Sequence, residues 1–184
     1  SADGPRNEEG KKLCLESRNI VINGIDWPCE LATRFSDTNH GCRGLGDAIS
    51  WFFEQEKWGI ILEDDCIPAP SFFLFCSDLL SFYEHDNRVM MISGDNFQNG
   101  KKYGDGSYYF SKYPHIWGWA TWRRAWENYD INMSDYPDFR TQCDNFNCFY
   151  SEAEKEFWLS IWDKVSKGQL DTWAYQLSYT VIKN

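Results

Sequence analysis

The sequence is short of basic charge. Its 18 Lys and Arg residues stand against 28 Asp and Glu residues, which gives a net charge of −10 at pH 7. A chain with this balance repels polyanions, so we expect neither nucleic acid nor an anionic membrane surface as its main partner. A phosphate-bearing ligand would need a local divalent cation to offset the negative charge.

Long apolar runs are also missing from the 184 residues. None approaches the roughly 20 apolar residues of a transmembrane helix, and no signal-peptide pattern opens the chain. The seven cysteines lack the paired spacing of zinc sites. We therefore expect a single cytoplasmic domain with reduced thiols and no transmembrane segment, for which peripheral membrane association stays open.

The most informative stretch runs from Gly59 to Pro68. Three apolar β-formers lead directly into Glu63, Asp64 and Asp65. A continuous apolar run that ends at a turn signal predicts a central parallel strand, buried on both faces. Ligands bind beyond the carboxyl ends of such strands, and oxygen ligands suit Mg²⁺ or Mn²⁺ held together with substrate phosphates. The alternative is a solvated acidic turn.

The remaining pattern alternates strands with helices. Apolar spacing, caps and turn signals predict helices over 7–22, from the glycine-rich turn 39–46 to about 53, and from Pro70 to about 83, with strands over 29–35 and 88–93. This order predicts an α/β fold with a mostly parallel central sheet flanked by helices.

The second half of the chain departs from that alternation. Residues 97–118 form an unusually long loop, of a length that is typical of functional segments. It leads to Trp117-Gly118-Trp119, where the rings can fill a core or the glycine can let a flat ligand approach the backbone. Residues 130–150 look irregular, and a capping box at Ser151 and Glu154 starts another helix.

Six short segments resemble, in order, nucleotide-sugar glycosyltransferases of the GT-A fold. The resemblance is to bacterial hemolytic-protein-like sugar transferases and, more distantly, to the N-acetylglucosaminyltransferases that begin N-glycan branching. The segments are Ala2–Arg6, Asp26–Glu30, Asn39–Cys42, Gly59–Pro68, Ile92–Gly94 and Trp117–Trp122. The resemblance implies a Rossmann-like GT-A domain over 1–184 that lacks the family's first strand and its C-terminal segment.

Four residues would then lie near the nucleotide. Asp3 would meet the base, uracil being the likeliest by family analogy, and the turn with Asn39 and Arg43 would lie beside it. His40 stands where the branching enzymes place a histidine close to the base. Independently of the resemblance, exposed amides at this helix start could hold phosphate with the help of Arg43.

The resemblance also assigns the metal and sugar ends of the site. Glu63-Asp64-Asp65 would stand for the family's DxD-type motif, in which Asp64 faces the ribose and Asp65 ligates the Mn²⁺ or Mg²⁺ that bridges the diphosphate. Such a metal stabilises charge on the departing nucleoside diphosphate. Gly118 and Trp119 would line the pocket where donor sugar and glycan acceptor meet.

One position departs from the family pattern. Relatives carry Asp where this chain has Ala174, and that Asp is, by analogy, the base that deprotonates the acceptor hydroxyl in an inverting displacement. Without it the step loses about 10²–10⁴-fold in rate. Three explanations of Ala174 are open. It can be a deliberate substitution, which we favour, or the chain can be a natural inactive relative. Alternatively, Asp171 can substitute as the base.

The sequence as a whole predicts a metal-dependent glycosyltransferase that moves a sugar from a nucleotide diphosphate to a glycan hydroxyl. Two alternatives remain: a non-catalytic nucleotide-sugar-binding domain, suggested by Ala174, and a metal-dependent phosphohydrolase that uses residues 63–65.

Overall fold

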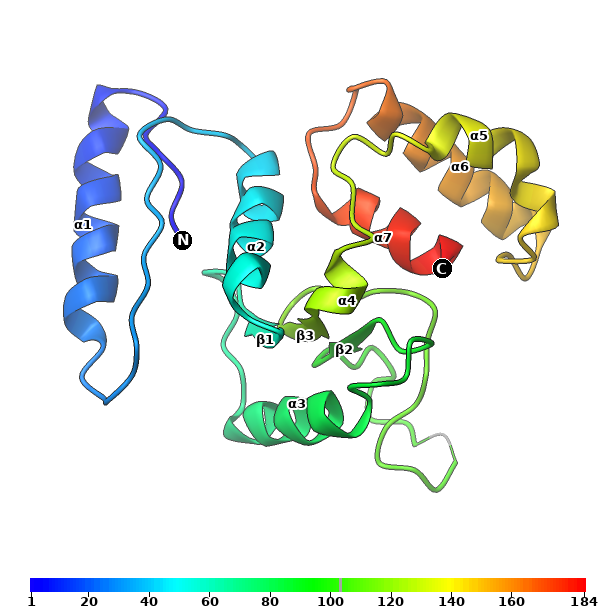
Figure 1. Ribbon diagram of the computed structural model, residues 1–184, viewed down its shortest axis with the longest axis horizontal. Coiled ribbons are helices and arrows are strands. Elements are labelled where there is room, and N and C mark those ends of the chain that lie inside the picture. Colours follow the sequence, from blue (N-terminus) through cyan, green and yellow to red (C-terminus); the bar gives the residue numbers. More distant parts are fainter. Residues whose placement is uncertain (103) are drawn as a thin grey trace.

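The protein is seen in a computed structural model that describes residues 1–102 and 104–184 (Figure 1). Tyr103, which belongs to the long loop expected over 97–118, lies outside the described residues. The helices are α1 (Glu8–Gly24), α2 (Arg43–Gln55), α3 (Pro70–Phe82), α4 (Arg123–Trp126), α5 (Tyr136–Gln142), the 3₁₀ helix η1 (Cys143–Asn145), α6 (Glu152–Ser166) and α7 (Ala174–Lys183). The strands are β1 (Trp58–Ile61), β2 (Met91–Ser93) and β3 (Trp119–Trp122).

The sheet corrects the fold class expected from the sequence. Its three strands lie in the order β1-β3-β2, and both pairings are antiparallel. The prediction of a mostly parallel, Rossmann-like GT-A sheet is therefore wrong, and the apolar run expected to form a central strand forms the edge strand β1 instead. The reason is that β3 lies between β1 and β2 and pairs with both, and an apolar run does not encode the direction of its partner.

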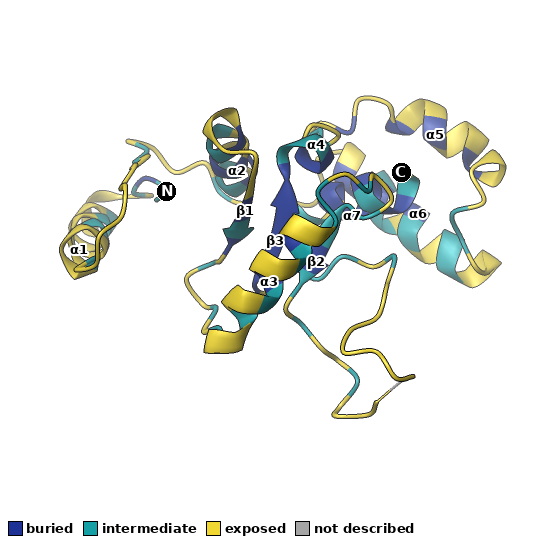
Figure 2. Cartoon of the chain, turned by 60° about the horizontal axis from the view of Figure 1, so that its bottom comes forward, coloured by how far each residue is buried: buried dark blue, intermediate teal, exposed yellow. Residues whose placement is uncertain are grey.

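Strand β3 is central because it pairs with a strand on each side, and all four of its residues are buried. Ala120 and Trp122 face α3, where they pack with Cys76 and Leu80, and the Trp122 Nε1–H donates to the Leu80 carbonyl at 3.0 Å. Trp119 faces the opposite side of the sheet. There it packs in a second cluster with side chains of α2, α4 and α7: Ile49, Phe53, Trp126 and Leu177. Figure 2 shows β3 buried between these layers.

A third cluster lies away from the sheet, among α5, α6 and α7. Trp162 of α6 is fully buried and its Nε1–H donates to Ser178 Oγ of α7 at 3.1 Å. Tyr136 and Phe139 of α5 are buried in the same cluster as Trp162. The expectation that residues 130–150 are irregular is therefore wrong for 136–145, which form α5 and η1, because their aromatic side chains cover α6 from a short helix of their own.

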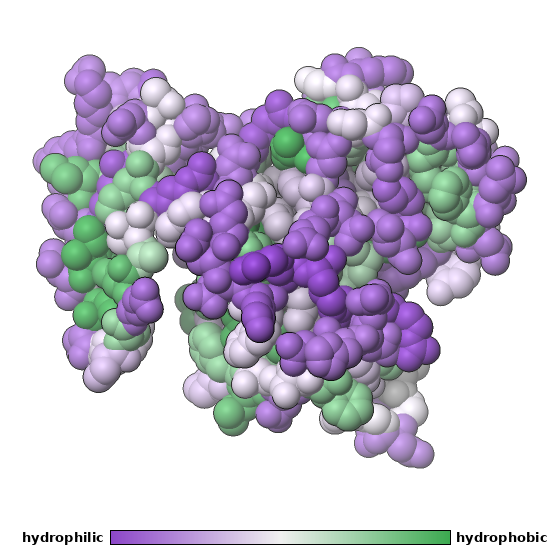
Figure 3. All heavy atoms as spheres, viewed as in Figure 1, coloured by the Kyte–Doolittle hydropathy of each residue, from purple (hydrophilic) through white to green (hydrophobic). Residues whose placement is uncertain are grey.

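The N-terminal segment stands apart from the sheet (Figure 1). Helix α1 begins at the expected place, where the Asn7 side chain accepts from the Gly10 amide, but it has no buried residue. The strand expected over 29–35 is reduced to one parallel bridge between Ala2 and Phe35. Leu13, Leu15 and Ile20 stay exposed, and Figure 3 shows apolar side chains along α1.

The helices predicted from apolar spacing are confirmed. In α2 the expected stripe buries Ala48, Ile49 and Phe53, and α3 begins with Pro70 in its first turn. Ser151 caps α6 by accepting from the Glu154 amide at 3.2 Å. Across residues 1–102 and 104–184, none of the helices has both the length and the apolar composition needed to cross a bilayer.

The packing of α3 on β3 predicts the effect of a core truncation. Leu80→Ala removes a fully buried side chain and should lower the free energy of unfolding by about 2–5 kcal/mol, because the cavity it leaves closes only partly. Leu74→Ala, on the same helix but 70 % exposed, is the matched control. Urea unfolding measures both, and equal losses would contradict this packing.

Candidate functional site

Three segments meet at one edge of the sheet. Strands β1 and β2 point in the same direction because each is antiparallel to β3, and the register sets both Ile61 and Ser93 opposite Trp119. The residues that follow β1, the residues that follow β2 and the residues that precede β3 therefore share this edge. Side chains far apart in the sequence are brought together here.

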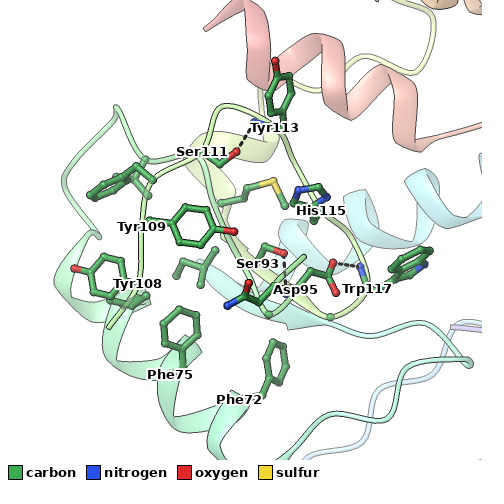
Figure 4. Close-up of a pocket in the computed structure, with 18 of the residues that line it drawn as sticks. Phe72, Phe75, Ser93, Asp95, Tyr108, Tyr109, Ser111, Tyr113, His115 and Trp117 are labelled. Atoms are coloured by element: carbon green, nitrogen blue, oxygen red, sulfur yellow. Dashed lines mark hydrogen bonds between the residues drawn. The ribbon is translucent and has the colours of Figure 1, made fainter. Parts of the chain in front are cut away.

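A cleft of about 1310 Å³ opens at this edge. It runs between α3, the end of β2 and the segment 107–118, and we refer to it below as the cleft (Figure 4). Its lining includes many aromatic side chains, among them Phe72, Phe75, Tyr108, Tyr109, Tyr113 and Trp117. Two of the described residues that line it carry side-chain carboxylates, Asp65 and Asp95. A ligand in the cleft therefore meets flat apolar faces and a few polar groups, as in most small-molecule sites.

The acidic turn after β1 supplies one of these carboxylates. The Cys66 amide donates to the Glu63 carbonyl at 3.1 Å, which closes the turn. Asp64 and Asp65 are exposed, while Glu63 is half-buried. Burial, followed by the negative charges of Asp65 and Asp64, raises the pKa of the Glu63 carboxyl. The turn thus concentrates negative charge that a cation would relieve.

The turn fits a divalent cation only as a partial ligand set. Among the residues that the structure describes, no three His, Cys, Asp or Glu side chains converge as a metal cage. Mg²⁺ and Mn²⁺ sites with one or two carboxylates take their other ligands from substrate phosphates and water. Asp65, exposed and facing the cleft, has the chemistry of such a ligand.

The residues expected near the nucleotide base form a separate group, here named the Asp3 cluster (Asp3, Asn39, His40 and Asp171). The Asp3 carboxylate accepts from the His40 amide at 2.9 and 3.0 Å. The Asn39 side-chain amide donates to the Gly4 carbonyl at 3.1 Å. Asp171 accepts from the Cys42 amide at 3.4 Å.

A glycine allows Asp171 to approach this turn. Gly41 has φ +62°, and a Cβ there would lie 2.6 Å from Asp171 Oδ2. Arg43 turns away from the group, donating to Asn132 Oδ1 at 3.0 Å. The structure thus gathers Asp3, Asn39, His40 and Asp171, but none of them lines the cleft.

The remaining predicted residues lie at the start of β3 and of α7. Gly118, at φ +80°, lines the cleft and accepts from the Gly94 amide at 2.8 Å. Trp119 is fully buried and stacks on Trp173, with ring centroids 6.1 Å apart. Its Nε1–H has no hydrogen-bond partner among the described residues. Ala174 begins α7, packs against the same cluster and does not line the cleft.

Sequence reasoning missed Asp95 as a site residue. Asp95 follows β2 by two residues, and its Oδ2 accepts from the Trp117 amide at 3.1 Å. The signal was available, because a carboxylate two residues beyond a strand lies at the same kind of strand end as Glu63 to Asp65. Its partner across the cleft, the loop 107–118, could not be located from the sequence.

The loop wall of the cleft is fastened to α6. The Lys112 ammonium pairs with Glu154 and donates to the Cys148 carbonyl at 2.9 Å, and it lies 3.6 Å from the centre of the Tyr150 ring. Tyr113 stacks on Trp158 with ring centroids 6.2 Å apart. Burial and a hydrogen bond to Glu154 raise the pKa of Tyr113 to about 12. These contacts hold the loop in place beside the cleft.

The raised pKa of Glu63 predicts that removing its charge increases the stability of the fold, by an amount that depends on pH. The pKa of Glu63 is raised in the folded chain, so the folded state holds this proton more tightly and ionisation at rising pH destabilises the fold. Glu63→Gln should therefore raise the urea midpoint at pH 7, and this gain should fade as the pH falls toward the ordinary value of 4.5 and be absent below it.

The matched control is Glu54→Gln, an exposed position on α2. This substitution should leave the urea midpoint unchanged both at pH 7 and below pH 4.5. A gain for Glu63→Gln that persists below pH 4.5, or a loss at pH 7, would show that folding does not raise the pKa of this carboxyl.

Comparison with known proteins adds no assignment to this geometry. Neither protein-family models, nor curated proteins, nor solved structures give a match to the chain. The function must therefore be argued from the cleft and the residues around it.

Proposed function

We propose that the chain is a glycosyltransferase that binds a nucleoside diphosphate sugar and transfers the sugar to a glycan hydroxyl. The observation that carries this proposal is the composition of the cleft. Asp65, Gly118 and Trp117 come from two of the segments that resemble nucleotide-sugar transferases, and they line one cavity together with aromatic rings. The proposal concerns the activity and does not depend on a parallel sheet.

The aromatic lining supports a sugar as one part of the ligand. Trp117 is 60 % exposed and Tyr109 is 46 % exposed although both line a cleft. Exposed rings of this size carry a large apolar face next to a polar edge, which suits an amphipathic ligand such as a pyranose ring. Polar groups at Ser93, Asp95 and Asn96 are available for its hydroxyls.

Charge supports a cation as a required partner of the donor. The net charge of −10 opposes the approach of a diphosphate. Asp65, with Asp64 beside it, would hold a Mn²⁺ or Mg²⁺ ion whose other ligands come from the diphosphate and water. Such an ion would supply charge stabilisation for the departing nucleoside diphosphate. The chain's own residues would bind and orient the sugar.

Calorimetric titration with UDP tests the donor site. The unmodified chain should bind UDP in the presence of Mn²⁺ and not in its absence. In the Asp65→Ala variant the affinity should fall by at least about tenfold, the lower end of the loss on removing even an outer-shell partner of a metal ligand.

The matched control is Asp78→Ala, an exposed aspartate of α3 outside the cleft, which should bind UDP as the unmodified chain does. UDP binding that is absent, that does not need the metal, or that survives Asp65→Ala would contradict the proposal. Binding of UDP-sugars without any transfer would instead identify a non-catalytic nucleotide-sugar-binding domain, the reading that Ala174 suggests.

A further inference from the structure

The carboxylate of Asp95 is held in a fixed position at the floor of the cleft. Its own amide donates to Ser93 Oγ at 3.2 Å, and its Oδ2 accepts from the Trp117 amide at 3.1 Å. Gly94 permits this path, because a Cβ there would lie 2.6 Å from the Phe72 ring. The side chain is therefore positioned by β2 on one side and by the approach to β3 on the other (Figure 4).

One oxygen of this carboxylate stays available to a ligand. Oδ1 of Asp95 receives no hydrogen bond from the described residues, and the side chain is only half-buried. Trp117 and Tyr109 line the same cleft with much of their surface exposed. A saccharide in this part of the cleft can rest on a ring while a hydroxyl donates to Asp95 Oδ1.

The two positions that the sequence suggested for a base, 174 and 171, do not line the cleft. Ala174 has no proton acceptor and packs in the buried cluster around Trp119. Asp171 is engaged with the Gly41–Cys42 turn of the Asp3 cluster. Of the two side-chain carboxylates that the described residues place in the cleft, Asp65 has the part of a cation ligand in the proposed function. Asp95 is the one that remains.

We propose that Asp95 is the general base of the transfer reaction and that the cleft around it binds the acceptor saccharide. The inference rests on the proposed function. The acceptor hydroxyl donates its hydrogen bond to Asp95 Oδ1, and its oxygen attacks the anomeric carbon of the donor sugar. A new C–O bond forms as the bond from that carbon to the diphosphate oxygen breaks. The hydroxyl proton passes to Asp95, and the bonding pair leaves with the nucleoside diphosphate.

His115 is the competing proton acceptor. It also lines the cleft, and its ring centroid lies 4.8 Å from that of Phe97. Among residues 1–102 and 104–184, no hydrogen bond holds the His115 side chain in the way that the Trp117 amide holds Asp95 Oδ2. The same experiment separates the two residues, because each has a variant that keeps size and polarity: Asp95→Asn and His115→Gln.

The experiment measures UDP release from UDP-glucose, UDP-galactose and UDP-N-acetylglucosamine with Mn²⁺, with and without chitotriose, maltotriose or lactose as the acceptor. The unmodified chain should show acceptor-stimulated release. Asp95→Asn should lower its kcat by about 10²–10⁴-fold, the range for loss of a general base, with little change in the KM of the acceptor. The amide oxygen can still accept from the Trp117 amide, so the loop should keep its place.

Three controls decide the outcome. Asp78→Asn, on the exposed face of α3, should retain kcat within a few-fold, His115→Gln should lower kcat less than Asp95→Asn does, and Ala174→Asp should not raise it. A retained kcat in Asp95→Asn, a loss confined to His115→Gln, or an activity that needs Ala174→Asp would each overturn the role of Asp95.

Failure of this inference is distinguishable from failure of the proposed function. Acceptor-stimulated release by the unmodified chain that survives in Asp95→Asn overturns the role of Asp95 and leaves the proposed function standing. Absence of metal-dependent UDP binding overturns the proposed function itself. Calorimetry of Asp95→Asn with UDP and Mn²⁺ should give the affinity of the unmodified chain, which shows that the variant is folded and that its donor site is intact.

Discussion

The position of β3 between β1 and β2 is the constraint on which the rest of the structure depends. Its four buried residues give α3 one face of the sheet and α2, α4 and α7 the other. Because both neighbours pair antiparallel with it, β1 and β2 end at the edge where β3 begins. This arrangement places the acidic turn, Asp95 and Trp117 around one cleft, although Asp65 and Trp117 are far apart in the sequence. The candidate site is therefore a consequence of how β3 pairs with β1 and β2.

Charge connects this architecture to its proposed chemistry. A net charge of −10 opposes the approach of a diphosphate. In the turn after β1, burial and then the negative charges of Asp65 and Asp64 raise the pKa of Glu63. Retaining such a turn beside a cleft costs stability unless a cation binds there. The aromatic wall has the opposite character, since its rings offer apolar faces to a neutral ligand. A metal-bound diphosphate at one end and a saccharide at the other accounts for both halves of the cleft.

Local patterns predicted the helices better than the sheet. The stripe in α2, the proline that opens α3 and the Ser151 cap of α6 are each determined by neighbouring residues, and all three are confirmed. The direction of β1 depends on a segment almost 60 residues away, so its apolar run could not reveal an antiparallel partner.

For the site, the sequence pointed to Asp65 and Gly118, which line the cleft, but it treated Trp119 as a ligand contact. That ring is fully buried, because alternation along β3 sends it into the core. Asp95 was missed because a single carboxylate after a strand acquires meaning only when the opposing loop is known.

The most direct test of this account is a map of where Mn²⁺ binds when UDP is present. Paramagnetic broadening of backbone amide signals in the isotopically labelled chain provides it. The account predicts that Mn²⁺ with UDP broadens signals from residues 62–66, 94–96 and 117–118, leaves those of α1 and α5 unchanged, and has a much weaker effect without UDP. Broadening that is independent of UDP, or that is strongest at the exposed Glu8 and Glu9 of α1, would contradict a donor site at this edge of the sheet.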